Sequence, residues 1–208
     1  MLFADRYDAG VQLAGVLREY EGGNGIILGL PRGGVIVGAA IASRLSLPLT
    51  VFVAAKIGAP DNPEYAIGAV AETGEISLNQ EVVAVYGVTR EYIEQAASRE
   101  RREIARRIAL YRGGEPLPDL AERTAILVDD GVATGYTMFA AAKALRARRV
   151  GALVVAVPVG PAETISILRH EADRVVCLAT PEPFFAVGRF YRDFHQVSDE
   201  EVVQALRT

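Results

Sequence analysis

Cysteine is nearly missing from this sequence of 208 residues: Cys177 stands alone, so no disulfide bond can form within the chain. Long apolar runs are missing as well, and none approaches the ~20 residues that a membrane-spanning helix needs. Near the start, Asp5, Arg6 and Asp8 place charges where a signal peptide requires an apolar segment. We therefore expect a soluble, cytoplasmic protein with no membrane partner.

An excess of positive charge is also missing, because the formal net charge is −4. This balance disfavours a nucleic-acid partner. Half of the residues are hydrophobic and 23% are charged, which is typical of a globular core and argues against disorder. The length and the lack of an internal repeat or low-complexity linker favour a single domain over residues 1–208.

Several catalytic signatures are absent too. The two histidines, His170 and His195, lie far apart without metal-ligand spacing, so the sequence predicts no dedicated metal site. No Ser/His/Asp or Cys/His set is evident, and neither G-x-x-x-x-G-K-[ST] nor a strand-to-helix G-x-G-x-x-G turn occurs. The chemistry therefore has to come from another arrangement of side chains.

What the sequence does contain is a series of short apolar runs that alternate with helical stretches. Runs that are apolar throughout are typical of strands buried on both faces, so this order predicts an α/β fold with a parallel central sheet flanked by helices. The long segment 57–79 is rich in glycine and proline, with β-like pieces at 67–71 and 76–78. We expect strands at 26–30, 49–55, 124–128, 152–157 and 174–178, and helices at 34–45, 89–112, 137–148 and 162–169.

The most informative segment follows the third expected strand of the core, and parallel sheets bind ligands beyond the carboxyl ends of their strands. Asp129 and Asp130 come first, and a loop of small residues and hydroxyls then leads into a helix. The backbone N–H groups of such a loop, with the positive end of the helix dipole, favour a phosphate. The carboxylates would accept hydrogen bonds from sugar hydroxyls, so a sugar phosphate satisfies both halves. The alternative is a simple helix cap, which leaves the second Asp unexplained.

The run Ile126-Leu-Val-Asp-Asp-Gly-Val-Ala-Thr-Gly-Tyr-Thr137 closely resembles the phosphoribosyl pyrophosphate (PRPP) signature of type I phosphoribosyltransferases. The resemblance implies that Asp129 and Asp130 are the catalytic pair and bind the ribose 2- and 3-hydroxyls. It implies transfer of the phosphoribosyl group from PRPP to a nitrogenous base, with release of pyrophosphate and with Mg²⁺ bound alongside PRPP. It also implies that the 5-phosphate is held by Gly131, Val132, Ala133, Thr134, Gly135 and Thr137.

Two other strand exits suit a pyrophosphate site. A Pro-Arg-Gly-Gly turn follows the first strand, where Arg32 offers a guanidinium fork and the amides of Gly33 and Gly34 can approach an anion closely. Lys56 ends the second expected strand. Taken alone, these residues could equally form a glycine turn with surface cations. The resemblance implies that all four bind pyrophosphate, with a strained cis peptide that we assign to Arg32–Gly33, and that 57–79 is a flexible lid.

The C-terminal segment, 180–208, is expected to form a small hood. It is rich in aromatic residues, and Phe184 or Phe185 could stack on a planar acceptor base. The segment loosely resembles the base-binding part of 6-oxopurine phosphoribosyltransferases. However, Ala133 stands where those enzymes have an Asp, and 158–161 lacks their Lys. The identity of the acceptor base stays open.

Other functions remain to be weighed against an enzyme. The same fold serves regulators that sense PRPP or a nucleotide without turnover, and hydrolases or phosphorylases of ribose phosphates need the same cradle. The arginine-rich stretch within 89–112 is expected to be a solvated or oligomer-facing surface, which leaves room for a homo-oligomer, and RNA binding is the sharper alternative. The Arg32 turn, Lys56 and the long excursion favour the enzyme, because a sensor has no need to exclude water.

Overall fold

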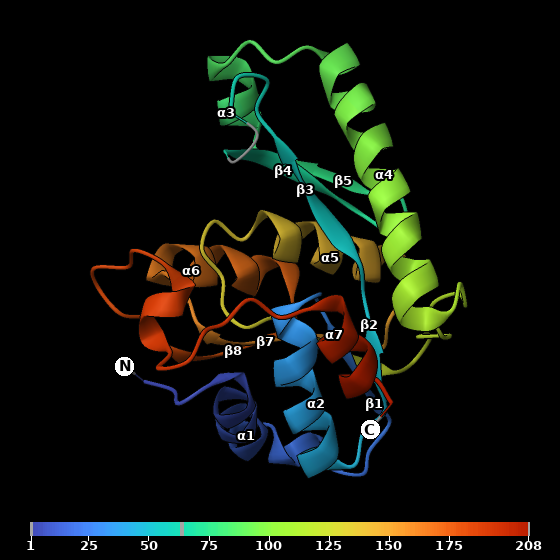
Figure 1. Ribbon diagram of the computed structural model, residues 1–208, viewed down its shortest axis with the longest axis vertical. Coiled ribbons are helices and arrows are strands. Elements are labelled where there is room, and N and C mark those ends of the chain that lie inside the picture. The colour runs from blue at the N-terminus through green and yellow to red at the C-terminus, as the bar shows by residue number, and fades with distance from the viewer. Residues whose placement is uncertain (1, 63–64, 208) are drawn as a thin grey trace.

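The computed structural model describes residues 2–62 and 65–207. Its centre is a five-stranded sheet in which every neighbouring pair is parallel, in the order β2-β1-β6-β7-β8 (Figure 1). Gly29 pairs with Val128, and Val128 with Ala156, so the carboxyl ends of three adjacent strands lie at one edge. The predicted parallel α/β fold is confirmed. The strands are β1 (Gly25–Gly29), β2 (Leu49–Val51), β6 (Thr124–Val128), β7 (Ala152–Val159) and β8 (Arg174–Ala179).

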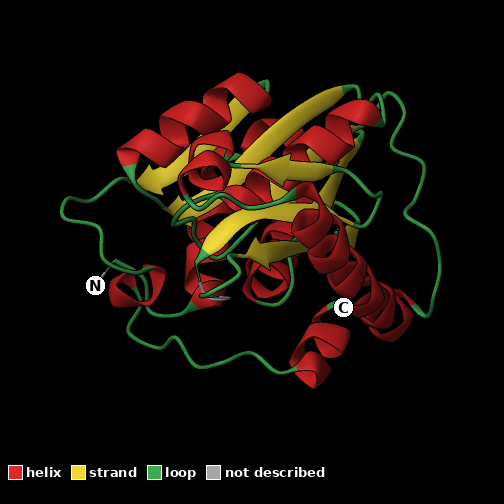
Figure 2. Ribbon diagram, turned by 90° about the horizontal axis from the view of Figure 1, so that it is seen from above, coloured by secondary structure: helices red, strands yellow, loops and turns green. Residues whose placement is uncertain are grey.

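Helices cover both faces of this sheet, because successive strand residues point to opposite sides (Figure 2). Ile27 and Ile126 face α1 and α2, whereas Leu28 and Leu127 face α5 and α6. All four side chains are fully buried, and each burial contributes about 1.5–3 kcal/mol. The helices are α1 (Arg6–Val16), α2 (Gly33–Leu45), α5 (Tyr136–Ala147) and α6 (Ala162–Glu171).

A second sheet of three antiparallel strands projects from one edge of the first, in the order β3-β4-β5 (Figure 1). The expected single strand at 49–55 is therefore wrong, because the chain changes sheet within it. The N–H of Phe52 still donates to the carbonyl of Gly29 at 3.0 Å, whereas the N–H of Val53 donates to Glu72 at 2.8 Å. The run is apolar throughout, so its composition shows no change. The strands are β3 (Ala54–Gly58), β4 (Ala66–Ala71) and β5 (Ile76–Leu78).

The expected excursion, 57–79, contains most of this second sheet. Its two β-like pieces are confirmed as β4 and β5. Residues 63 and 64 fall within the range and lie outside the described residues. Ile67 and Val70 of β4 are fully buried and pack with apolar residues of α4, and β4 also contacts α5. Movement of this sheet as a lid stays a prediction.

The long helix expected at 89–112 is confirmed as α4 (Arg90–Arg112), which runs along β3 (Figure 1). Thr89 caps its start, with Oγ1 accepting the N–H of Tyr92 at 3.2 Å. It ends at Gly113, whose φ of 62° suits glycine. The apolar face packs on the second sheet. A short helix, α3 (Gln80–Val85), precedes it.

Arg112 at the end of α4 does not lie on the solvated surface that we expected for the arginines of this helix. Its guanidinium pairs with the carboxylate of Glu72 at 2.9 Å, and the two side chains are 7% and 4% exposed. Burial raises the pKa of Glu72, and the N–H of Val53 and the charge of Arg112 oppose that rise. This buried pair ties α4 to the junction between the two sheets.

The N-terminal residues pack against the C-terminal segment, so both contribute to the hood. Phe3 forms a β-bridge with Tyr191, and the N–H of Arg192 donates to the carbonyl of Phe3 at 2.9 Å. Three helices were not expected: α1, α3 and α7 (Asp199–Ala205). α7 begins with a capping box between Ser198 and Glu201, a signature that is visible in the sequence. Among the helices of 2–62 and 65–207, none is long and apolar enough to cross a membrane.

Candidate functional site

Three cavities meet at Asp129, at the carboxyl edge of the main sheet. One of about 130 Å³ is enclosed by the loop 131–138. A second of about 410 Å³ lies between the turn after β1, the N-terminal Arg6 and residues 194–197. A third of about 600 Å³ lies between β3, α4 and Thr137. Asp129 lines all three, so the first carboxylate of the predicted pair stands at their common point.

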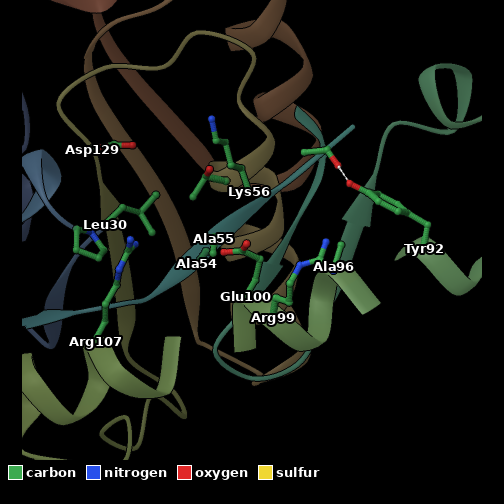
Figure 3. A pocket seen from close by; sticks show the side chains of 13 residues that line it. Leu30, Ala54, Ala55, Lys56, Tyr92, Ala96, Arg99, Glu100, Arg107 and Asp129 are labelled. Carbon is green, nitrogen blue, oxygen red and sulfur yellow. Dashed lines mark hydrogen bonds between the residues drawn. The ribbon is translucent and has the colours of Figure 1, made fainter. Parts of the chain in front are cut away.

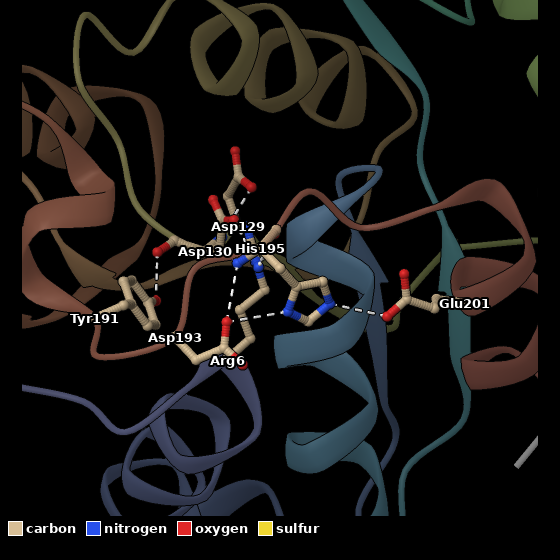
Figure 4. Close-up of polar contacts among 7 residues, drawn as sticks. All are labelled: Arg6, Asp129, Asp130, Tyr191, Asp193, His195 and Glu201. Carbon is tan, nitrogen blue, oxygen red and sulfur yellow. Dashed lines mark hydrogen bonds and ion pairs between the residues drawn. The ribbon is translucent and has the colours of Figure 1, made fainter.

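The second carboxylate, Asp130, is held by contacts from distant parts of the chain (Figure 4). Its Oδ2 accepts from Nε of Arg6 at 2.7 Å. The hydroxyl of Tyr191 donates to its backbone carbonyl at 2.5 Å. Its own N–H donates to Oδ1 of Asp129 at 2.8 Å, which fixes the two carboxylates relative to each other. Asp130 therefore joins the sheet, α1 and the hood.

Electrostatics make this pair of acids costly to keep charged. Burial raises the pKa of Asp129 well above its usual range, and the charge of Asp130 adds to the rise. Burial also raises the pKa of Asp130, while the hydrogen bond and charge of Arg6 act in the opposite direction. Arg6 is therefore the group that most favours the charged form of this carboxylate.

Arg6 was missed by the sequence reasoning, which treated it only as a charge near the start of the chain. Its side chain is 8% exposed. Besides Asp130, its guanidinium donates to the carbonyl of His195 at 2.9 Å and lies 3.9 Å from the ring centre of Phe194. No local pattern could have revealed this role, because Arg6 and Asp130 lie 124 positions apart.

The loop after Asp130, which is the predicted phosphate cradle, lines the smallest of the three cavities. Gly135 has a φ of 79° and precedes α5, whose N-terminal end faces the small cavity. A Cβ at Gly135 would lie 2.7 Å from Cγ2 of Thr164. The hydroxyl of Thr164 holds the loop by donating to the carbonyl of Ala133 at 2.9 Å. The small cavity is lined by Gly131, Val132, Ala133, Thr134, Gly135 and Thr137, with Asp129, Tyr136 and Met138.

One member of this loop has a structural role. Val132 is 3% exposed, and its N–H donates to the carbonyl of Val159 at 2.9 Å. That amide therefore anchors the loop to the end of β7. Gly131 is also tightly packed, because a Cβ there would lie 2.5 Å from Cγ1 of Val187 in the hood. The shape of the cradle thus depends on both the sheet and the hood.

The residues predicted for pyrophosphate are divided between two cavities. Arg32 and Gly33 line the 410 Å³ cavity, and Lys56 lines the 600 Å³ cavity. A Cβ at Gly33 would lie 1.9 Å from Oδ2 of Asp130, so only glycine fits there. Gly34 is buried, and its Cβ would lie 2.5 Å from the carbonyl oxygen of Val128, so its smallness serves the contact between the turn and β6.

The cis peptide expected at this turn is present, but the assigned bond is wrong. It joins Pro31 to Arg32 and not Arg32 to Gly33. Because Gly33 and Gly34 lack side chains, this turn can lie close to the carboxyl groups of Asp130 and Asp129.

The predicted base-binding aromatics lie in the hood. Phe184 packs against Phe190 with ring centres 5.3 Å apart, and Phe185 is 71% exposed beneath the guanidinium of Arg189. The three cavities at Asp129 are lined by other described residues. A role for Phe184 and Phe185 in base binding stays a prediction.

His195 also lines the 410 Å³ cavity. Its Nε2 lies 2.9 Å from a carboxylate oxygen of Glu201, and its Nδ1 lies 3.2 Å from one of Asp193 (Figure 4). These two partners raise the pKa of His195. Sequence reasoning had noted His195 only as a residue without metal-ligand spacing. Near neutral pH this cavity therefore holds Arg6, Arg32 and a histidine that is biased toward its charged form.

The 600 Å³ cavity contains a second group of cations (Figure 3). Lys56 of β3 and Arg99 and Arg107 of α4 line it, together with Glu100. We had expected the arginines of α4 to be solvated or to face an oligomer. Arg99 is exposed, as expected, whereas Arg107 is half-buried, and both line this cavity. The helix is attached to β3 here, because the hydroxyl of Tyr92 donates to the carbonyl of Gly58 at 2.9 Å.

Comparisons with known proteins agree with this geometry. Residues 8–194 match the family model of the phosphoribosyl transferase domain. The chain is 44% identical over 205 residues to "Putative phosphoribosyl transferase Rv0571c" of Mycobacterium tuberculosis. That match covers 99% of this chain and 46% of the relative, so the chain spans about half the length of the curated relatives it matches.

Solved structures show the same fold. The crystal structure of TT1426 from Thermus thermophilus is 42% identical, covers 99% of this chain and 98% of its own, and has a TM-score of 0.83. A purine phosphoribosyltransferase from Pyrococcus horikoshii shares the fold at 18% identity and a TM-score of 0.50, over 91% of this chain and 90% of its own. Together with the family match, these likenesses lead to one conclusion: the chain belongs to the phosphoribosyl transferase domain family, with the type I fold.

Proposed function

We propose that this protein transfers the 5-phosphoribosyl group from PRPP to a nitrogenous base and releases pyrophosphate. The observation that carries the proposal is the meeting of three cavities at Asp129. PRPP and an acceptor together present three groups around one ribose: a 5-phosphate, a pyrophosphate and a base. A site with a small anion cradle and two larger cation-lined cavities around a carboxylate suits that combination.

The ribose would lie over the two carboxylates. Oδ1 of Asp129 accepts the N–H of Asp130, and Oδ2 of Asp130 accepts from Arg6, so their second oxygens are the natural acceptors for the 2- and 3-hydroxyls. The 5-phosphate would enter the cradle of about 130 Å³ at the start of α5. The residues in this role are those predicted from sequence, with Val132 acting through its packing.

The reaction breaks the bond between C1 of the ribose and the pyrophosphate oxygen and forms a bond from C1 to a nitrogen of the acceptor. Positive charge develops on the ribose in the transition state, and negative charge develops on the leaving pyrophosphate. The buried carboxylates Asp129 and Asp130 lie where they can stabilise the first charge. Arg32 and the amides of the Gly33 turn in one cavity, and Lys56 in the other, would stabilise the second.

Mg²⁺ fits the side chains at this site as a companion of the substrate. Carboxylate oxygens are ligands that it prefers, and Asp129 and Asp130 supply them. The described residues contain no group of three or more His, Cys, Asp or Glu that could hold an ion alone, so phosphate oxygens and waters would complete its coordination. When bound, the ion would neutralise part of the charge on the departing pyrophosphate.

The test is pyrophosphate release from PRPP and Mg²⁺ in the presence of purines, pyrimidines or heterocyclic acids, one at a time. We expect one class of acceptor to stimulate release, and Asp129→Asn to lower the stimulated rate by about 10²-fold or more. A wild-type protein that fails to bind PRPP would refute the proposal. If the protein binds PRPP but no acceptor stimulates pyrophosphate release, the protein is a sensor and not a transferase.

A further inference from the structure

Helix α4 lies outside the main sheet and its flanking helices, yet it forms one wall of the largest cavity at the site (Figure 3). Its residues in that wall are spaced so that they share one side of the helix. The small side chain of Ala96 leaves room beside Arg99. Toward the end of the helix, Arg107 lines the same cavity as Leu30 and Pro31 of the turn after β1. The wall consists of Tyr92, Ala96, Arg99, Glu100 and Arg107.

This wall is held in place by contacts with β3 and within α4. The hydroxyl of Tyr92 donates to the carbonyl of Gly58, and the guanidinium of Arg99 lies 6.0 Å from the ring centre of Tyr92. Nε of Arg107 donates to Glu103 at 2.9 Å. These contacts limit the freedom of both guanidinium groups, so less entropy is lost when they bind an anion.

The charges in the cavity favour a ligand that bears an oxyanion. Lys56, Arg99 and Arg107 contribute three positive charges, and Glu100 and Asp129 contribute two carboxylates. Asp129 is already assigned to the ribose, and Arg107 also pairs with Glu103 at 2.9 Å, so the lysine and the two arginines exceed the remaining carboxylates, Glu100 and Glu103, by one. Guanidinium groups match the planar, bidentate geometry of carboxylates and phosphates.

We infer that the cavity between β3 and α4 binds an oxyanion of a substrate, a phosphate or a carboxylate, through Arg99 and Arg107. The inference rests on the proposed function, because Asp129 and Thr137 border the cavity and place its ligand beside the ribose. The oxyanion has two possible sources. It belongs either to the leaving pyrophosphate or to an acceptor base that carries an acid group.

The two sources correspond to two arrangements of the substrates. The 410 Å³ cavity and the 600 Å³ cavity approach Asp129 from different parts of the fold, one from α1 and the hood and the other from β3 and α4. If pyrophosphate occupies the cavity of Arg32, the acceptor occupies the cavity of α4 and is an acid. If pyrophosphate occupies the cavity of α4, Arg99 and Arg107 bind the leaving group.

Calorimetric titration of the whole protein with three probes tests the inference. The probes are inorganic pyrophosphate with Mg²⁺, a set of pyridine and pyrimidine carboxylates, and ribose 5-phosphate. The variants are Arg99→Met, Arg107→Met and, as a matched control, Arg102→Met, an exposed arginine of α4 that is not among the residues lining the cavity. Thermal melting verifies that each variant is folded, and Arg107→Lys replaces Arg107→Met if the latter melts early.

We expect Arg99→Met and Arg107→Met each to weaken the binding of one oxyanion probe by about ten-fold or more. Ribose 5-phosphate binding should change less than two-fold, and Arg102→Met should resemble the wild type. Loss of pyrophosphate binding identifies the leaving group, and loss of carboxylate binding identifies an acidic acceptor. Unchanged affinity for both, or no wild-type affinity for either, overturns the inference. A wild-type protein that binds an oxyanion through these arginines but not ribose 5-phosphate refutes the proposed function alone.

Discussion

Replacing Arg6 by methionine tests whether its ion pair keeps Asp130 charged. The two side chains are 8% and 16% exposed, and breaking such a pair by removing one partner costs roughly 3–5 kcal/mol. Methionine keeps a similar length without the charge. The variant can reduce this loss of unfolding free energy by binding a proton at Asp130. The pKa of Asp130 in the folded state should therefore rise.

The sign of the pH dependence follows from the raised pKa values. Burial already holds the pKa of Asp129 and of Asp130 above the ordinary value, and Arg6 opposes this. A carboxyl group with a raised pKa in the folded state stabilises the fold fully below its unfolded pKa, and this contribution is lost as the pH rises through the folded pKa. Arg6→Met moves the folded pKa further upward. The difference in unfolding free energy from the wild type should therefore be small near pH 4 and reach roughly 3–5 kcal/mol by pH 8.

Ligand binding should change in the opposite direction with pH, because the ribose hydroxyls need charged acceptors. As the pH falls, both proteins should lose affinity for ribose 5-phosphate. We expect Arg6→Met to lose it at a pH about one unit or more higher than the wild type. Calorimetric titrations between about pH 5 and pH 9, with urea unfolding in the same buffers, measure both effects. Titration of the ligand's own phosphate is common to both proteins and cancels.

Arg6→Lys is the matched control, because it retains the positive charge while losing the guanidinium geometry. It should keep most of the wild-type pH profile even if its affinity is lower. The reasoning is refuted if Arg6→Met binds ribose 5-phosphate more weakly by the same factor at every pH. That result would mean that Arg6 shapes the pocket without influencing the charge of Asp130.

Three further predictions concern binding and stability. Asp129→Asn should weaken ribose 5-phosphate binding by about ten-fold or more in calorimetry, yet cost less than about 1 kcal/mol in urea unfolding, because asparagine keeps the oxygen that accepts the N–H of Asp130; equal losses would favour a helix cap. Gly33→Ala should abolish that binding, since its Cβ would lie 1.9 Å from a carboxylate oxygen, whereas Gly15→Ala, whose Cβ meets nothing within 4 Å, should bind normally. Glu72→Gln should lower the unfolding free energy by roughly 3–5 kcal/mol, because its arginine partner stays buried; a loss below about 1 kcal/mol would show that the pair is effectively solvated.

The parts of the fold that could be predicted from sequence are those with a local signal. The apolar runs of the main sheet end where polar loops begin, and the segment from Asp129 to Thr137 concentrates acids, small residues and hydroxyls at one strand exit. The capping residue Thr89 and a long periodic row of apolar residues predict helix α4. Each of these features depends on neighbours within a few residues.

The parts that sequence reasoning missed depend on contacts between distant residues. Arg6 meets Asp130 only after α1 packs beside the sheet. In the sequence alone, nothing distinguishes Arg6 from an arginine on the surface. Arg99 and Arg107 were expected to be solvated or to face an oligomer, and only the position of β3 shows that they line a cavity. The sequence does not show the change of sheet near Phe52, because the residues on both sides of it are apolar and buried.

The joining of Phe3 to Tyr191, and of Arg6 to the carbonyl of His195, has a consequence for biosynthesis. A ribosome makes residues 3–6 nearly 190 positions before it makes residues 191–195. Until the later segment emerges, the guanidinium of Arg6 lacks part of its surroundings and the acids of the sheet lack their hood. A chain that is released before residue 191 would therefore carry the whole segment from Asp129 to Thr137 and still lack the contacts that close the pocket around it.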